Sequence, residues 1–357
     1  MIGVALKDAQ KLAAVAGRTL PKNSPKPILN AVLVTANEGV VRFTTYNATS
    51  GFHVQAPEIS GGEERFVVQE GERFLNVLKL AEGSDVSLVH EGDRVLLLAG
   101  KSRLNLPAGD AREYPEIPLM KEFAAFPGLI RALYKTVPFA AKDPFSSMAG
   151  VQVAIREGRW TVEATSGREA ARLSGVVERS DEEWLITPED ARDACAAFPA
   201  EETVYAKQQG AFLLVSDGLG TTWATRLLER KFIQMEPIFA VAPAGHWSAS
   251  RPALLGAVKR TLAAVADKDN KSALIAFDKD FLKIIGKSPY GDIEEVIDAQ
   301  YTGEPKSFGF DLRYLQHLLA QWESEEVRSD LFSLNHGLGM RLRGENEEYV
   351  LAGVLTR

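Results

Sequence analysis

A threefold internal repeat constrains the fold of this 357-residue chain more than any other feature. Amphipathic, helix-like segments recur along it, each followed by an apolar, strand-like segment, and they start at Leu6, Leu129 and Ala253. A second set of helix-like segments follows short apolar strands, with predicted N-caps at Gln69, Thr187 and Asp311. Self-similarity at a nearly constant spacing indicates one structural unit that is copied along the chain.

The stretches between these helices alternate between apolar and polar residues, as in VRFTTYN and RWTVEAT. Alternation with a period of two is typical of strands in a sheet that has one wet face. The predicted class is therefore α+β, with three repeated domains that each pack two helices on antiparallel sheets. Proline-containing connectors place the predicted domain boundaries at 1–119, 120–243 and 244–357.

Positive charge follows the same repeat. Lys11, Lys135 and Lys259 recur at intervals of 124 residues, and Arg18 and Lys142 share the same offset in the first two copies. A lysine on one helix is usually a solvated surface residue. Recurrence at one position in three copies favours a basic helix face that meets a polyanion, although the net charge of −7 argues against binding by bulk charge.

The sequence contains no complete motif for catalysis or metal binding. The GKS of LLLAGKSR lacks the earlier glycine of a phosphate-binding loop, since Val95 occupies that position. The five histidines show no metal-ligand spacing, and the single cysteine, Cys195, excludes an intramolecular disulfide. No apolar stretch reaches membrane-spanning length. The sequence therefore predicts a cytoplasmic protein without catalytic residues, metal or cofactor.

The repeat, the segments PKPILNAVLV and KSRLNLPAGDAREYPEIP, and the apolar C-terminal strand together resemble the bacterial DNA polymerase III beta subunit, the sliding clamp. The resemblance covers essentially the whole chain. It implies a non-enzymatic homodimer, closed head to tail into a ring of six domains with helices around a central hole. The implied partners are double-stranded DNA, the replicative polymerase alpha subunit, the clamp-loader complex and other clamp-binding-motif proteins, with no membrane partner.

The resemblance also assigns site residues. The partner-peptide pocket, a cleft between the second and third domains, is predicted to comprise Met148, Thr165, Gly167, Ala170, Pro237, Val241, Asp311, Tyr314, Met340, Val350, Leu351, Ala352, Gly353 and Val354. The predicted DNA-facing cations are Lys7, Lys11, Arg18, Lys22, Arg73, Arg131, Lys135, Lys142, Lys259 and Arg260. The predicted dimer interface joins an edge strand of the first domain to a helix of the third, through Leu104, Leu106, Ala264 and Val265.

Two departures from the family pattern leave the peptide preference of the pocket open. The chain has SGREA at residues 166–170, where members of the family often have Asp-Gly-His-Arg-Leu. It has AGVLTR at residues 352–357, where they often end Met-Pro-Met-Arg-Leu. Part of this apolar end is expected to complete the third core, and the remainder to form a wall of the pocket.

Two other functions compete with the clamp. A repeat-built α/β transferase acting on a phosphorylated small molecule would need a cluster of Lys, Arg and Asp that the sequence does not locate. A purely structural oligomer without a DNA partner is the third alternative.

Overall fold

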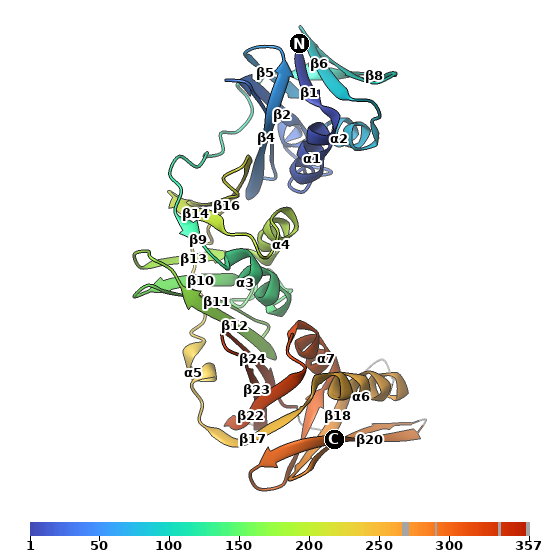
Figure 1. The fold of residues 1–357 in the computed structure, drawn as a ribbon, viewed down its shortest axis with the longest axis vertical. Helices are drawn as coiled ribbons and strands as arrows, with labels where there is room; N and C mark the ends of the chain where they lie inside the picture. Colours follow the sequence, from blue (N-terminus) through green and yellow to red (C-terminus); the bar gives the residue numbers. More distant parts are fainter. Residues whose placement is uncertain (266–270, 290, 335–336, 355–357) are drawn as a thin grey trace. The chain divides into compact units, whose positions relative to one another are not determined.

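The computed structural model describes residues 1–265, 271–289, 291–334 and 337–354. Contacts divide the chain into two compact units, and each is considered by itself. Unit 1 comprises Met1–Arg131 and Glu189–Glu229, and unit 2 comprises Ala132–Pro188 and Arg230–Arg357. Each unit contains one 12-stranded antiparallel sheet with helices packed on it (Figure 1). The predicted α+β architecture is confirmed, whereas the boundaries at 119 and 243 stay a prediction.

The sheet of unit 1 runs in the order β1-β6-β7-β8-β5-β2-β3-β4-β16-β15-β14-β9. Its strands are β1 (Ile2–Ala5), β2 (Val32–Asn37), β3 (Val40–Tyr46), β4 (Ser50–Ser60), β5 (Glu64–Val68), β6 (Asp85–Glu91), β7 (Arg94–Ala99), β8 (Ser102–Gly109), β9 (Ala125–Phe126), β14 (Val204–Gln209), β15 (Phe212–Ser216) and β16 (Thr221–Arg226). Helices α1 (Leu6–Ala16) and α2 (Gly71–Leu80) belong to this unit, as does α4 (Pro188–Ala197) apart from Pro188. A short 3-10 helix, η1 (Pro27–Asn30), precedes β2.

The sheet of unit 2 runs in the order β13-β10-β11-β12-β24-β23-β22-β17-β20-β19-β18-β21. Its strands are β10 (Val151–Arg156), β11 (Arg159–Thr165), β12 (Glu169–Val176), β13 (Glu182–Ile186), β17 (Pro243–Ser250), β18 (Ser272–Asp278), β19 (Phe281–Ser288), β20 (Gly291–Thr302), β21 (Lys306–Asp311), β22 (Glu326–Leu334), β23 (Gly337–Arg343) and β24 (Glu347–Ala352). The helices are α5 (Glu236–Phe239), α6 (Arg251–Ala264) and α7 (Leu312–Gln321), with most of α3 (Leu129–Thr136) and the 3-10 helix η2 (Val137–Phe139).

The helices form where the repeat predicts them, but their N-termini are capped in different ways. Asp311 caps α7, as predicted, because its carboxylate accepts a hydrogen bond from the Arg313 amide at 3.0 Å. The prediction for Gln69 is wrong. The N-cap of α2 is Glu70, which has a left-handed backbone (φ 57°) and makes no side-chain capping bond.

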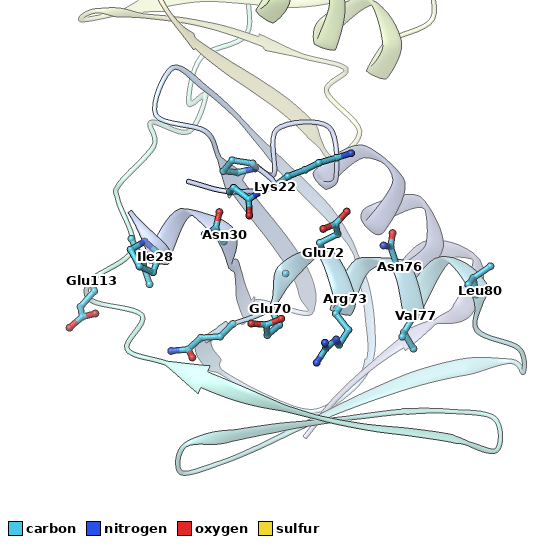
Figure 2. Close-up of a pocket in the computed structure, with 15 residues that line it drawn as sticks. Lys22, Ile28, Asn30, Glu70, Glu72, Arg73, Asn76, Val77, Leu80 and Glu113 are labelled. Carbon is cyan, nitrogen blue, oxygen red and sulfur yellow. The ribbon is translucent and has the colours of Figure 1, made fainter. Parts of the chain in front are cut away.

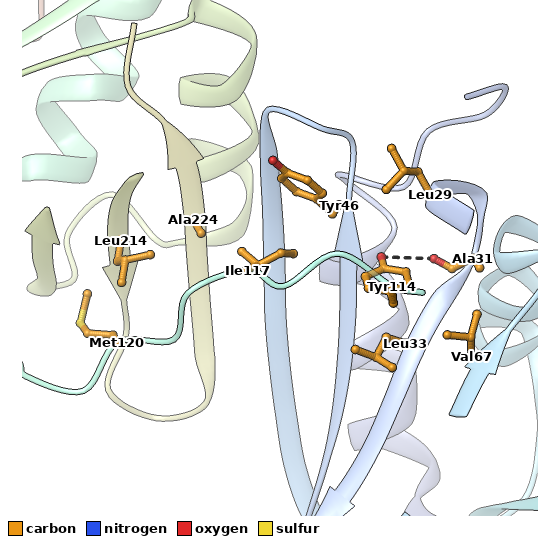
Figure 3. Close-up of a cluster of buried hydrophobic side chains, with 10 residues drawn as sticks. All are labelled: Leu29, Ala31, Leu33, Tyr46, Val67, Tyr114, Ile117, Met120, Leu214 and Ala224. Atoms are coloured by element: carbon orange, nitrogen blue, oxygen red, sulfur yellow. Dashed lines mark hydrogen bonds between the residues drawn. The ribbon is translucent and has the colours of Figure 1, made fainter. Parts of the chain in front are cut away.

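The segment that links the first predicted domain to the second is part of a core and not a loose connector. Tyr114, Ile117 and Met120 lie on this segment and are buried together with side chains of the sheet in unit 1 (Figure 3). The Tyr114 hydroxyl donates to the Thr44 carbonyl oxygen at 3.3 Å. The YPEIP pattern therefore supplies an apolar strap that packs along the sheet where β4 and β16 meet.

Two strand pairs join successive copies of the repeat. In unit 1, β4 of the first copy pairs with β16 of the second, from Ser50↔Thr225 to Val54↔Thr221. In unit 2, β12 of the second copy pairs with β24 of the third, from Glu169↔Leu351 to Leu173↔Glu347. Each pairing, called a seam below, joins the second strand of one hairpin (β3–β4 or β11–β12) to the second strand of another (β15–β16 or β23–β24).

The repeat contains one more copy of each seam strand, which is β8 in the first copy and β20 in the third. Each of them has an open edge over part of its length. Within the described residues, the 102–106 part of β8 pairs only with β7, because β5 joins β8 at Ala108 and Gly109. Likewise, the 291–298 part of β20 pairs only with β19, as far as the structure describes it, and β17 joins from Ala299. Exposed strand edges present unpaired backbone groups to other chains. Each unit therefore carries one seam strand, β8 or β20, whose open edge has no partner among the described residues.

Acid should weaken the fold through His53, which lies on β4 at the first seam. Its Nδ1 is 2.9 Å from the Thr44 hydroxyl oxygen, and burial, assisted by the positive charge of Arg42, lowers the His53 pKa to about 4. The unfolded chain protonates this ring near pH 6.5, so stability is fully present above that pH and falls as the pH drops towards 4. The shift corresponds to roughly 3 kcal/mol.

Urea unfolding of the wild type and of His53→Gln at pH 7 and pH 4.5 tests this expectation. Glutamine retains a polar contact to Thr44 but does not titrate, so the wild type should lose more stability on acidification than the variant does. Equal losses in the two proteins would mean that His53 does not titrate abnormally.

Candidate partner-binding cleft and basic surface

A cleft of about 590 Å³ opens on unit 2, where three elements meet. These are the segment from Pro138 in η2 to Ser146, the turn between β11 and β12, and α7 from Arg313 to His317. The lining residues are Pro138, Ala140, Ala141, Lys142, Asp143, Ser146, Ser166, Glu169, Arg313, Tyr314 and His317. The cleft therefore brings together parts of the chain that belong to the second and third copies of the repeat.

The turn between β11 and β12 needs glycine at its tip. Gly167 has a φ of 83°, and its amide donates to the Thr165 hydroxyl at 3.0 Å. A Cβ at Gly167 would lie 3.2 Å from the sulfur and methyl carbon of Met148. Met148 thus lies against the tip of the turn, so these two predicted pocket residues are brought together as the sequence implied.

Ion pairs organise the polar side of the cleft. Glu169 is buried at the start of β12, and its carboxylate is 2.9 Å from Nδ1 of His317 on α7. Arg313 extends from α7 and donates to both carboxylate oxygens of Asp311, at 3.0 and 2.6 Å. These hydrogen bonds to Asp311 hold the half-exposed guanidinium of Arg313 in one orientation at the mouth of the cleft.

The C-terminal strand β24 is not part of the lining of this cleft, and its end is hydrogen-bonded residue by residue. The amide of Ala352 donates to the Arg168 carbonyl, and that of Val354 to the Gly309 carbonyl, both at 2.8 Å. The Gly353 amide donates to the Leu338 carbonyl at 2.8 Å, and a Cβ at Gly353 would lie 2.5 Å from that oxygen. Glycine at position 353 therefore lets the chain end pass close to β23.

The linker that carries Pro237 and Val241 is held by two arginines. Arg172 of β12 pairs with Glu236 of α5 at 2.9 Å, and its guanidinium lies 4.1 Å from the Phe239 ring centre. Arg341 of β23 is fully buried and donates to the carbonyls of Phe239 and Val241. These contacts fix the linker against both halves of the sheet in unit 2.

Of the predicted pocket residues, only Tyr314 is among those that line this cleft, although all of them belong to unit 2. They divide by exposure. Those that reach the surface are Met148, Gly167, Pro237, Val241, Tyr314, Ala352, Gly353 and Val354. The buried ones are Thr165, Ala170, Asp311, Met340, Val350 and Leu351, which shape the region from beneath. Their role in peptide binding stays a prediction.

Sequence reasoning missed several residues of the cleft. Glu169, Arg313 and His317 line it, but none of them was predicted as part of the pocket. The signal that could have found Glu169 is the departure SGREA, which places an acid where the family often has arginine. His317 and Arg313 carry no local signal, because their side chains meet the cleft only after α7 packs beside β12.

Most of the predicted DNA-facing cations lie on exposed positions. Lys7 and Lys11 project from α1 on the side opposite its buried residues. Lys259 and Arg260 are exposed on α6, with Arg260 paired to Glu295 at 2.7 Å. Arg18 and Lys142 are also exposed, and Arg131 pairs with Glu201 at 3.1 Å. A further cleft of about 770 Å³ contains Lys22 and Arg73 and lies along α2 (Figure 2).

The prediction that Lys135 faces DNA is wrong. Only 3% of this residue is exposed, and its ammonium nitrogen is 3.1 Å from a carboxylate oxygen of Glu347 and 2.9 Å from one of Glu323. The periodicity of 124 residues placed it correctly on the first helix of its copy. However, the C-terminal half of α3 is covered by α7 and β24, so the same sequence position is buried in this copy.

The predicted interface residues need the same correction. Leu106 is 2% exposed and Val265 is 1% exposed, so both belong to cores of their own units and cannot be free interface anchors. Leu104 remains half-buried on the open part of β8, and Ala264 is exposed at the end of α6. Leu104 and Leu106 share one face of β8, because they are two residues apart. Leu106 lies closer to Ala108 and Gly109, where β5 joins β8.

Two family models match this chain. The model for the DNA polymerase III beta subunit N-terminal domain matches residues 8–118, and that for the C-terminal domain matches residues 243–352. Together they cover more than half of the chain. The protein belongs to the DNA polymerase III beta subunit family. The curated relatives are distant in sequence.

The "Beta sliding clamp" of Streptomyces coelicolor is 25% identical over 315 residues, which cover 85% of this chain and 83% of the relative. That of Escherichia coli K12 is 20% identical over 311 residues, covering 85% of each chain. The sliding clamp structure from Bacillus subtilis matches with a TM-score of 0.92 at 17% identity, covering 100% of this chain and 99% of the other. The Thermotoga maritima beta subunit gives 0.89 at 20% identity, with the same coverage. The structural matches establish the clamp fold.

Two further findings concern the part of this beta subunit that the structure describes. No group of three or more His, Cys, Asp or Glu residues is arranged there to hold a metal ion. None of the helices placed in the structure is long and apolar enough to cross a membrane.

Arg341 should be essential for the stability of unit 2, whereas its neighbour Arg343 should not. Both guanidinium groups contact the carboxylate of Asp330, but Arg341 is fully buried and Arg343 is about half exposed. Arg341→Met removes the donor to two linker carbonyls and the buried one of the two guanidinium groups on Asp330 Oδ2, which should cost about 3 kcal/mol. Arg343→Met should cost less than about 1 kcal/mol, because exposed ion pairs contribute little.

Urea denaturation of both variants and the wild type measures these losses. Similar losses for the two substitutions would contradict the assignment of Arg341 as the residue that holds the linker.

Proposed function

We propose that this beta subunit works as a DNA sliding clamp, in which two copies close head to tail into a ring around duplex DNA. The ring tethers the replicative polymerase alpha subunit and other clamp-binding-motif proteins, which dock by a short peptide at the cleft region of unit 2. A clamp-loader complex opens the ring, and the protein acts in the cytoplasm. Its working modules are the three copies at 1–119, 120–243 and 244–357.

The observation that carries this proposal is the pair of unmatched seam strands. Two of the three junctions that a ring of repeated domains needs are present within one chain, as β4–β16 and β12–β24. The open parts of β8 and β20 are the corresponding halves of the third junction. A heterologous contact between them closes only if a second copy supplies the opposite half, which favours a head-to-tail dimer.

The charges on the two open strands are complementary. Arg103 is exposed on β8, and Lys101 precedes that strand. Asp292 and Glu294 are exposed on β20. Since Leu106 and Val265 are committed to their own cores, attraction between a basic and an acidic strand supports the contact that backbone pairing would form.

The basic positions on α1 and α6 support the DNA partner. Lys7, Lys11 and Lys259 are exposed, and a sliding protein needs attraction to phosphates without contacts that read bases. Membership of the beta subunit family favours this function over the transferase and over an oligomer that binds no DNA.

Topological retention tests the function itself. The protein, loaded by a clamp loader onto closed circular duplex DNA, should stay with the DNA through gel filtration at a salt concentration that removes electrostatically bound protein. Cleavage of the circle at one site should release it, because a ring slides off a free end. Loss from the intact circle, or retention after cleavage, would exclude a sliding ring.

Charge reversal on β8 tests the proposed dimer. Arg103→Glu places a negative charge against the acidic β20 of the second copy and should raise the dimer dissociation constant at least about tenfold, since like charges across an interface repel. Arg94→Glu is the matched control, because Arg94 is exposed on β7, which pairs with strands on both sides. Light scattering over a dilution series gives both constants, and an unchanged dimer for Arg103→Glu would contradict this interface.

A further inference from the structure

Lys135 has every donor of its ammonium group satisfied inside unit 2. Its nitrogen lies 2.7 Å from the carbonyl oxygen of Gln321, 2.9 Å from a carboxylate oxygen of Glu323 and 3.1 Å from one of Glu347. An ammonium group carries three hydrogen-bond donors, and three acceptors surround it. A buried charge without partners is strongly destabilising, so this arrangement depends on all of these groups staying together.

The three acceptors come from elements that are far apart in the sequence. Gln321 is the last residue of α7, Glu323 follows it closely, and Glu347 is the first residue of β24. The Glu347 carboxylate also accepts a hydrogen bond from the Tyr349 hydroxyl at 2.9 Å. Lys135 therefore attaches α3 of the second copy to one helix and one strand of the third copy.

The same helix also lines the cleft, and the same strand leads to residues that the sequence assigned to the pocket. Tyr314 and His317 of α7 line the cleft, and β24 ends in the apolar residues of the predicted pocket. The η2 helix after Lys135 leads directly into the lining segment that begins at Pro138. One cation thus connects three parts of unit 2: the C-terminal end of α7, whose earlier residues line the cleft, the start of β24, and the chain that leads into Pro138.

An aromatic layer lies between the lysine and the cleft. The Phe139 ring centre is 4.6 Å from that of His317 and 5.3 Å from that of Tyr349. His317 in turn pairs with Glu169 in the cleft. A shift of α7 or β24 at Lys135 therefore reaches the cleft through side chains in direct contact, as expected in a densely packed interior.

We propose that Lys135 is a positioning residue for the partner-peptide site, fixing α7 and β24 so that the cleft walls are preformed before a peptide docks. The inference rests on the proposed function for the identity of the ligand. Preformed walls reduce the ordering cost of binding, so removal of the ammonium should weaken peptide binding even though Lys135 itself does not touch the peptide. In this copy of the repeat, the lysine at the recurring position thus serves partner binding instead of DNA binding.

The decisive experiment compares Lys135→Met with Lys259→Met, which changes the same position of the third copy. Methionine retains most of the side-chain length and removes the charge. Calorimetry with a Gln-Leu-x-Leu-Phe peptide should show about tenfold weaker binding for Lys135→Met, while the salt dependence of DNA binding stays that of the wild type. Lys259→Met should show the reverse, with peptide affinity retained and a smaller salt slope on DNA.

Hydrogen exchange provides a readout of position within the native protein. In Lys135→Met, amides of β24 and of the C-terminal half of α7 should exchange faster at a temperature where the protein remains folded, and amides of α1 should not. If Lys135→Met fails to fold, Glu347→Gln serves instead, because it keeps an acceptor for Tyr349 and removes only the charge. Weaker peptide binding by that variant, with an unchanged DNA salt slope, supports the proposal.

Wild-type peptide affinity in folded Lys135→Met, or in Glu347→Gln where the first variant does not fold, would overturn the inference and leave Lys135 a purely stabilising residue. Loss of DNA affinity by Lys135→Met in parallel with Lys259→Met would overturn it as well. A wild-type protein that binds no such peptide would instead contradict the proposed partner site, so the two failures are distinguishable.

Discussion

Backbone pairing between strands of successive repeats is the interaction on which the rest of this structure depends. Each repeat ends in a hairpin whose last strand needs a neighbour, and the chain supplies that neighbour twice, at β4–β16 and at β12–β24. Both seams merge the sheets of two copies into one 12-stranded sheet. Because buried backbone groups must be hydrogen-bonded, these seams fix which side chains meet across the copies, and the cleft on unit 2 is one result.

Charged residues have distinct roles on either side of these sheets. Buried guanidinium and ammonium groups, such as Arg341 and Lys135, bond carbonyls and carboxylates from several elements and hold them together. Lys7 and Lys11 on α1 and Lys259 on α6 are instead exposed, and Arg260 of α6 is exposed while pairing with Glu295. The net charge of −7 is compatible with both roles, since the sum over the chain does not show where each charge lies.

Two departures from the family pattern can be related to contacts in the structure. Glu169 replaces the arginine often found in the family, and its carboxylate lies 2.9 Å from Nδ1 of His317. Gly353 stands where proline is common, and its amide bonds Leu338 at a spacing that admits no side chain. Both changes alter the surface that a peptide would meet while keeping the β12–β24 seam intact.

The sequence by itself determined the α+β class, the repeat and the helix positions, because these follow from local periodicity that any single copy displays. The same local signals also made Asp311 a correct cap. Only the tertiary structure decided which side chains would be buried. Lys135 occupies the same position in the repeat as Lys11 and Lys259, yet contacts with α7 and β24 bury it. Leu106 reads like an edge anchor, yet it faces its own core. The burial of Lys135 depends on contacts between residues more than 180 positions apart, as in its bond to Gln321, and no local pattern encodes them.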